Sequence, residues 1–185
     1  MKEKDNTYNL TESQLIEGCV RHDKRAQRRL YDLYSKRMAS VCMRYCGDYE
    51  TALDLMHDGF IKLFTHIESY SGQGVFEAWM RKIFVNTSLE YLRKNDALRN
   101  SNQIDEDIQL MSSEISVIEE LSANEIMVLI QELPVGFRTV FNLYAIEGYS
   151  HAEIAKMLTI NESSSRSQFS RARTILKTKI LDLYK

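Results

Sequence analysis

The scarcity of proline and glycine is the feature that most constrains what this chain can fold into. Its 185 residues include one proline and seven glycines, whereas average usage would give roughly nine prolines. Folds made of many short strands place these two residues at their turns, so the composition argues against such folds. Hydrophobic residues make up 44% of the chain, which is enough for a packed core and argues against global disorder. The composition therefore favours an all-α protein.

Apolar residues recur every three or four positions in segments that are bounded by capping residues. The predicted helices are a short one that opens at residue 11, then 23–45, 48–64, 76–98, one that opens at 122–125 and ends at 132, then 137–146, 154–158 and 163–184. Residues 11–14, 122–125 and 150–153 have the spacing of a capping box. Gly47 is placed to end the second helix, and Pro134 and Gly136 to separate the fifth from the sixth. The predicted inward faces include Leu33 and Ile61.

Charge is segregated along the chain. The formal net charge is −2. Residues 95–122, however, carry seven acidic residues and one basic residue, while the segments on either side are each net +2. The stretch 95–121 also lacks a sustained apolar period, so we predict an acidic linker there. It would join a domain at 1–94 to a domain at 122–185, which gives two small helical domains as the predicted architecture.

The sequence disfavours membrane and secreted proteins. No apolar run approaches the roughly 18 residues that cross a membrane. The charged start at residues 1–5 leads into no apolar stretch, so we expect no signal peptide. Three cysteines in a chain of this length favour a reduced, cytoplasmic protein.

Two residue pairs raise the alternative of a metal site. His57 and Asp58 are adjacent, as in His-Asp metal-dependent phosphohydrolases, but the three other histidines form no ligand spacing with them. Cys42 and Cys46 lie four residues apart on one predicted helix face, where buried apolar thiols are the commoner case. We therefore expect neither a metal, a cofactor nor an enzyme.

Residues 148–173 carry the strongest local pattern. A capped short helix, a turn of about four residues and a longer basic helix are the parts of a helix-turn-helix. The residues predicted to be buried there are Ile154, Leu158, Ile160, Phe169, Ala172 and Leu176. Ser165 falls on the same buried face, so Ser165→Val is predicted to stabilise the domain by removing an unpaired hydroxyl. The other face carries hydroxyls and arginines that suit base edges and phosphates; the alternative is an ordinary helical hairpin with a solvated basic face.

Motifs in both halves resemble one family. The C-terminal half reads Leu129-x-x-x-Leu133-Pro134, Arg138-x-Val140-Phe141-x-Leu143, Glu147-Gly148-Tyr149-Ser150, Glu153-Ile154-Ala155 and Arg171-Ala172-Arg173. The N-terminal half reads Leu30-Tyr31-x-Leu33-Tyr34, Asp54-Leu55-x-His57-Asp58-x-Phe60-x-Lys62-Leu63, and Phe76-x-x-Trp79-x-x-x-Ile83-x-x-Asn86 followed by Leu92-Arg93-Lys94. In this order and spacing they resemble the extracytoplasmic-function (ECF) sigma factors of the sigma-70 family, promoter-specificity subunits of bacterial RNA polymerase.

The chain departs from that family's pattern at three places. His57-Asp58 stands where Gln-Glu is usual. Thr159-Ile160-Asn161 stands where the turn usually has Gly-Ile-Ser, and residues 163–168 differ from the usual Gly-Thr-Val-Lys-Ser-Arg. Thr159 must then take a turn position that glycine occupies without strain. These departures bear on the promoter sequence that is read rather than on the fold.

The resemblance implies an alternative sigma factor that directs core RNA polymerase to specific promoters and aids opening of their −10 region. The residues implied to bind the clamp helices of the polymerase largest subunit are Asp54, Leu55, His57, Asp58, Phe60 and Lys62. Those implied to contact −10 DNA are Tyr70, Phe76, Trp79, Arg81, Lys82, Asn86, Tyr91, Arg93 and Lys94. Those implied to contact −35 DNA are Ser163, Ser164, Arg166, Ser167, Ser170 and Arg171. An anti-sigma factor is a further implied partner.

Other functions stay open on the sequence alone. A conventional helix-turn-helix regulator would bind duplex DNA stably without polymerase, and a purely protein-binding helical module would need no DNA. Failure to bind core polymerase would favour one of these two. For Trp79, a place in the core is favoured over a DNA contact.

Overall fold

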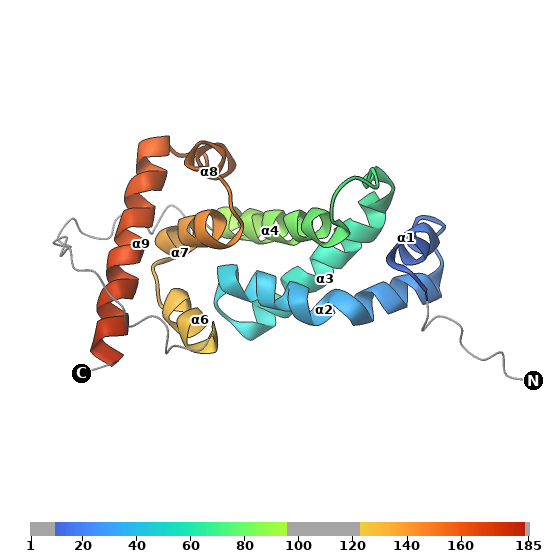
Figure 1. The fold of residues 1–185 in the computed structure, drawn as a ribbon, viewed down its shortest axis with the longest axis horizontal. Coiled ribbons are helices and arrows are strands. Elements are labelled where there is room, and N and C mark those ends of the chain that lie inside the picture. Colours follow the sequence, from blue (N-terminus) through green and yellow to red (C-terminus); the bar gives the residue numbers. More distant parts are fainter. Residues whose placement is uncertain (1–9, 96–122, 184–185) are drawn as a thin grey trace, which may run out of the picture. The chain divides into compact units, whose positions relative to one another are not determined.

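The computed structural model describes residues 10–95 and 123–183, and within these ranges every regular element is a helix (Figure 1). The all-α prediction is confirmed. The chain divides into two compact units, residues 1–88 and 89–185, which are described separately below. The predicted acidic linker at 95–121 lies outside the described residues except for Asn95.

The first four α-helices and one short 3-10 helix follow one another from residue 12. They are α1 (Glu12–Val20), α2 (Lys24–Cys46), α3 (Tyr49–His66), η2 (Ile67–Ser69) and α4 (Phe76–Lys94). Thr11 caps α1 in the predicted capping box, in which its Oγ1 accepts from the Gln14 amide at 3.3 Å. Gly47, at φ 86°, ends α2. Capping residues satisfy backbone groups that the helix itself leaves unpaired, which is why they locate helix ends in a sequence.

The core of the first unit is built from one stripe on each of its long helices. The residues with the least exposure on α2, α3 and α4 include Leu30, Met38, Tyr45, Leu63, Met80 and Phe84. Leu33 and Ile61 were predicted to face inward, and this is wrong: they are 43% and 65% exposed. At about 100° per residue, Ile61 lies roughly 160° around α3 from Leu63, so the two cannot share a face.

Gly59 of α3 lets α4 approach closely. A Cβ atom built on Gly59 would overlap the ring of Phe84. That ring also meets Phe60 edge to face, with centroids 5.1 Å apart. The absence of a side chain at Gly59 therefore sets how near α3 and α4 can lie.

We expect Gly59→Ala to destabilise the chain by about 1–3 kcal/mol, because an added methyl in a packed core forces neighbours to shift. This loss outweighs the gain of about 1 kcal/mol that alanine brings to a helix interior. Denaturant unfolding of the full chain measures it, with Lys36→Ala on the exposed face of α2 as control. A more stable Gly59→Ala variant would show that Phe84 moves aside freely.

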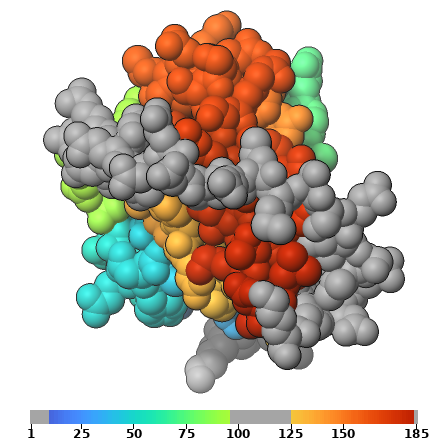
Figure 2. Space-filling view, turned by 90° about the vertical axis from the view of Figure 1, so that its left-hand side faces the viewer, coloured from blue at the N-terminus to red at the C-terminus, as the bar shows by residue number. Residues whose placement is uncertain are grey.

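The second unit is organised around the long helix α9. Its elements are α6 (Ala123–Gln131), α7 (Val135–Phe141), the π-helical turn η5 (Asn142–Ile146), α8 (His151–Leu158) and α9 (Glu162–Leu183). Its apolar cluster comprises Leu129, Ile130, Leu133, Phe137, Ala172 and Leu176. Figure 2 shows α6 alongside α9, where Lys179 pairs with Glu132 at 2.5 Å. None of the described helices combines the length and the apolar character that a bilayer crossing requires.

Helix α7 begins earlier than predicted. Pro134 does separate it from α6, but α7 starts at Val135, so Gly136 lies inside the helix and is buried. A proline at the start of a helix removes no intrahelical hydrogen bond, because the first amides have no partner there. The prediction that Gly136 lies in the break between the two helices is therefore wrong.

Candidate nucleic-acid interface

Helices α8 and α9 form the predicted helix-turn-helix. Ser150 and Glu153 make the predicted capping box at the start of α8: the Ser150 amide donates to Glu153 Oε2 at 2.8 Å and the Glu153 amide to Ser150 Oγ at 3.3 Å. Thr159 ends α8 with φ 56° and ψ 46°, the left-handed conformation expected from its place in the turn. The Ile160 amide then donates to the Ala155 carbonyl at 3.0 Å, which closes the turn.

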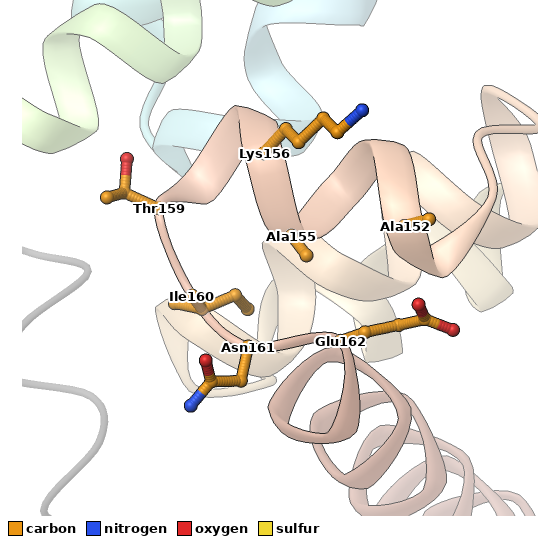
Figure 3. Close-up of a pocket in the computed structure, with 7 residues that line it drawn as sticks. All are labelled: Ala152, Ala155, Lys156, Thr159, Ile160, Asn161 and Glu162. Carbon is orange, nitrogen blue, oxygen red and sulfur yellow. The ribbon is translucent and has the colours of Figure 1, made fainter.

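A shallow open groove lies along this turn (Figure 3). It is lined by Ala152, Ala155, Lys156, Thr159, Ile160, Asn161 and Glu162. Ala155 points toward the turn segment that carries Ile160 and Asn161, and Lys156 points away from it. Small side chains on α8 thus leave the start of α9 accessible.

Most of the residues predicted to contact −35 DNA are accessible at the start of α9. Ser163, Arg166, Ser167 and Ser170 are exposed, while Ser164 and Arg171 are half-buried. Arg166 pairs with Glu162 one turn earlier, with Nη2 and Oε1 2.5 Å apart and the arginine side chain 64% exposed. An exposed pair of this kind contributes little to stability, so the guanidinium can exchange its carboxylate for another partner.

Ser165 is buried as its helical register predicted, but its hydroxyl has a partner. The side chain is 0% exposed, and Oγ lies 2.9 Å from Nδ1 of His151, itself 8% exposed. The prediction that Ser165→Val stabilises the domain is therefore wrong, because valine would leave the histidine nitrogen unpaired in a buried place. The sequence analysis did not predict that His151 is the partner of Ser165. Its position directly after the Ser150 cap, on the helix that packs against Ser165, could have indicated this contact.

The environment of His151 disfavours its charged form. Burial lowers the pKa of His151 below its ordinary 6.5; the positive charge of Arg166 lowers it further, and Glu162 opposes the shift. The ring stacks on Tyr144, with centroids 4.3 Å apart, and meets Phe169 at 5.8 Å. The fold thus favours the neutral form of an imidazole that packs in one cluster with the rings of Tyr144 and Phe169.

We expect the stability of the chain to fall as the pH drops below 6.5 through the lowered folded pKa of His151. In that window the unfolded chain binds a proton that the folded chain does not, so acid favours unfolding, whereas the contribution of His151 is complete above it. Melting temperatures at about pH 7.5 and about pH 5.5 test this, and His151→Phe should show a smaller decrease than the wild type. Equal decreases would contradict the assignment.

The residues predicted to bind polymerase divide into two groups on α3. Asp54, His57 and Asp58 are exposed and Lys62 is half-buried. Leu55 and Phe60 are 5% and 3% exposed, so the prediction that they contact a partner is corrected: they pack in the core beneath this face. The His57 ring is held from α2, where the Tyr31 hydroxyl lies 3.1 Å from its Nε2. Tyr31 was not predicted as part of this surface.

The structure does not favour the metal sites that the sequence left open. No group of three or more His, Cys, Asp or Glu side chains in the described ranges could hold a metal ion. Burial raises the pKa of the Cys42 thiol to about 12. The Cys42 side chain is 0% exposed, as expected of a thiol that packs as a small apolar residue.

Three of the residues predicted to contact −10 DNA lie at or near the start of α4. Tyr70, Phe76 and Trp79 form an aromatic cluster, with the Tyr70 centroid 5.1 Å from Phe76 and 5.3 Å from Trp79. Phe76 is 0% exposed, so its predicted DNA contact is corrected to a supporting place in the core. The Tyr70 hydroxyl donates to the Gly74 carbonyl at 2.8 Å and so closes the preceding loop.

Polar members of the same set lie along α4. Lys82, Asn86, Arg93 and Lys94 are exposed, and Trp79, Arg81 and Tyr91 are half-buried. At about 100° per residue, Trp79, Lys82 and Asn86 fall within roughly 60° of one another on the helix. This face of α4 thus offers an aromatic plane, a cation and an amide together, the groups that bind unstacked bases.

A capped helix-turn-helix with an arginine- and serine-bearing second helix defines a DNA-binding protein, and the comparisons with known proteins give its family. Residues 30–98 match the model of sigma-70 region 2, and residues 123–176 match that of sigma-70 region 4. The ECF RNA polymerase sigma-E factors of Haemophilus influenzae and Escherichia coli K12 are each 28% identical to this chain over 94% of its length, and over 97% and 96% of theirs.

Solved structures share the fold. The sigma factor RpoE from Bartonella quintana, in complex with the anti-sigma factor NepR, is 19% identical, with a TM-score of 0.51 over 85% of this chain and 98% of that one. CnrH, in complex with the cytosolic domain of CnrY, is 20% identical, with a TM-score of 0.50 over 92% and 97%. Because the two family models together match more than half of the residues, the chain belongs to the sigma-70 family. Within that family, it is similar over 94% of its length to ECF sigma factors.

Proposed function

We propose that this chain directs core RNA polymerase to a restricted set of promoters by dividing the work between its two halves. The observation that carries the proposal is the order of the two matches, region 2 at 30–98 and region 4 at 123–176, on a chain whose α9 presents Arg166 and serines beside a capped turn. Acting at a promoter, the second half reads −35 DNA and the first half binds polymerase and the −10 region. The acidic stretch 95–121 links them.

Each half uses a different kind of surface. The exposed carboxylates of Asp54 and Asp58 on α3 suit basic residues on the clamp helices of the polymerase largest subunit. Lys82, Asn86 and the half-buried Trp79 on α4 suit a melted −10 strand. Sigma factors are in general not enzymes, and we infer that this one acts in the cytoplasm, without a cofactor or chemistry of its own.

An anti-sigma factor is part of the proposal. It is supported by a solved structure with this fold, in which the sigma factor RpoE of Bartonella quintana is bound to the anti-sigma factor NepR. In a second structure with this fold, CnrH is bound to the cytosolic domain of CnrY. Co-purification of the chain from its host, with and without competing core polymerase, would identify such a partner.

Transcription from a promoter library by core polymerase plus this chain tests the function. We expect transcripts from a small promoter set that shares −35 and −10 sequences. A conventional regulator would instead bind duplex DNA without polymerase and would leave the transcript pattern of core polymerase unchanged. That result would overturn the proposal.

We expect Asp58→Arg to weaken binding of core polymerase by several kcal/mol, because it places a positive charge against a basic partner surface. Asp58 is exposed, so the fold should be retained. Pull-down of core polymerase measures the loss, and Glu68→Arg, an equal reversal of charge at an exposed residue of η2, is the matched control. Unchanged binding by Asp58→Arg would refute the docking assignment.

We expect Arg166→Ala to relax the base preference at one or two −35 positions, because a bidentate arginine discriminates between bases by about 1–3 kcal/mol. Lys177 lies eleven residues later, about 16 Å along α9. Lys177→Ala should therefore weaken binding to all −35 sequences equally, or leave binding unchanged. Selection on randomised −35 duplexes with the holoenzyme compares the two variants at two salt concentrations. An unchanged motif for Arg166→Ala would show that this face does not read bases.

A further inference from the structure

A buried hydrogen bond joins the two helices of the helix-turn-helix. It links Nδ1 of His151, the first residue of α8, to Oγ of Ser165 on α9 at 2.9 Å. Both side chains are buried, at 8% and 0% exposure. The family pattern to which the chain is similar has an apolar residue where Ser165 stands, so this polar contact replaces an ordinary apolar one.

His151 is held from several sides. The capping box of Ser150 and Glu153 fixes the backbone directly before it and the first turn of α8. Its ring lies 11° from parallel to the ring of Tyr144 and packs against the edge of Phe169. Phe169 belongs to α9, so the supports of the imidazole outside α9 are the capping box and Tyr144, and from them it presents Nδ1 to Ser165.

Ser165 lies in the first turn of α9, among the residues that we propose to contact −35 DNA. It is the fourth residue of the helix, and its amide donates to the Asn161 carbonyl at 3.1 Å. Ser164 and Arg166 are its immediate neighbours, each turned about 100° away around the axis. The direction in which Ser165 faces thus determines the direction in which the base-reading residues face.

A hydrogen bond constrains that direction more tightly than apolar packing does. Its donor, hydrogen and acceptor must lie close to a line, whereas burial of apolar surface has no preferred direction. A valine at residue 165 would fill similar space and stay buried through a modest rotation of α9. With serine at residue 165, the same rotation of α9 would break the hydrogen bond between its hydroxyl and Nδ1 of His151.

We propose that His151 is a positioning residue for −35 recognition: its hydrogen bond to Ser165 sets the rotation of α9 about its own axis, and with it the direction of Arg166. The inference rests on the proposed function, because it assumes that α9 reads the −35 element. His151 itself touches no base in this scheme and acts only through Ser165.

Three variants of the full chain test the proposal in holoenzyme. Ser165→Thr and Ser165→Val have the same shape but differ in the hydroxyl, so only the threonine variant can keep the bond. The double variant His151→Phe with Ser165→Val removes both polar groups and keeps a ring beside Tyr144. For each, the −35 base preference is measured by transcription from a randomised promoter library, and the melting temperature of the free chain is measured alongside.

We expect Ser165→Thr to keep the wild-type preference. Ser165→Val should lose about fivefold or more of the discrimination at the position read by Arg166, the lower end of what one bidentate contact supplies. The double variant should recover thermal stability, because it leaves no buried polar group unpaired. It should keep the relaxed −35 base preference, because no bond then fixes the direction in which Arg166 faces. If Ser165→Val folds too poorly to assay, the double variant decides.

Two other outcomes overturn the inference in distinguishable ways. If the double variant recovers the preference together with stability, or if Ser165→Val keeps it, the bond is structural only and His151 does not position the helix. If the wild-type holoenzyme shows no −35 preference at all, the assignment of −35 reading to α9 fails, and the positioning role fails with it.

Discussion

A helix of eight residues is not stable in water by itself, and this limit governs the half of the molecule that carries the helix-turn-helix. Helix α8 has eight residues, whereas isolated helices shorter than about 12–15 residues are marginal even for favourable sequences. It persists because a capping box satisfies its first amides and because Ile154, at 0% exposure, packs inside the second unit. The packing of α8 against α9 and η5 is therefore what allows the short helix to exist at all.

Local rules predicted much of this architecture. Capping residues and apolar periods act within a few residues of one another, so they located Thr11, Gly47 and Ser150 as helix ends. The turn position of Thr159 was expected from the family resemblance, since glycine is usual there. One kind of error arose where a residue at the margin of an apolar stripe could lie on either side of it. Leu33 is such a residue, and only the packing of whole helices decided that it faces outward.

The candidate sites show where a sequence motif stops being informative. A family motif contains both the residues that touch a partner and the residues that support them, and similarity of sequence does not separate the two. Leu55, Phe60 and Phe76 matched the motifs yet are buried. The contacts of His57 with Tyr31 and of His151 with Ser165 join residues 26 and 14 positions apart. They depend on how two helices are rotated relative to each other, which the period of either helix alone does not determine.

The backbone at Thr159 has a consequence for motion. A β-branched residue at φ 56° is strained by roughly 1–2 kcal/mol, and that strain is released as soon as the turn opens. Local opening at this joint is therefore about 5- to 30-fold more populated than it would be without the strain. Amide hydrogens around the turn should exchange with solvent sooner than those of the α7–α9 core. The strained backbone at Thr159 thus favours opening of the turn between α8 and α9. The buried hydrogen bond between His151 and Ser165 links the two helices across this turn and opposes its opening.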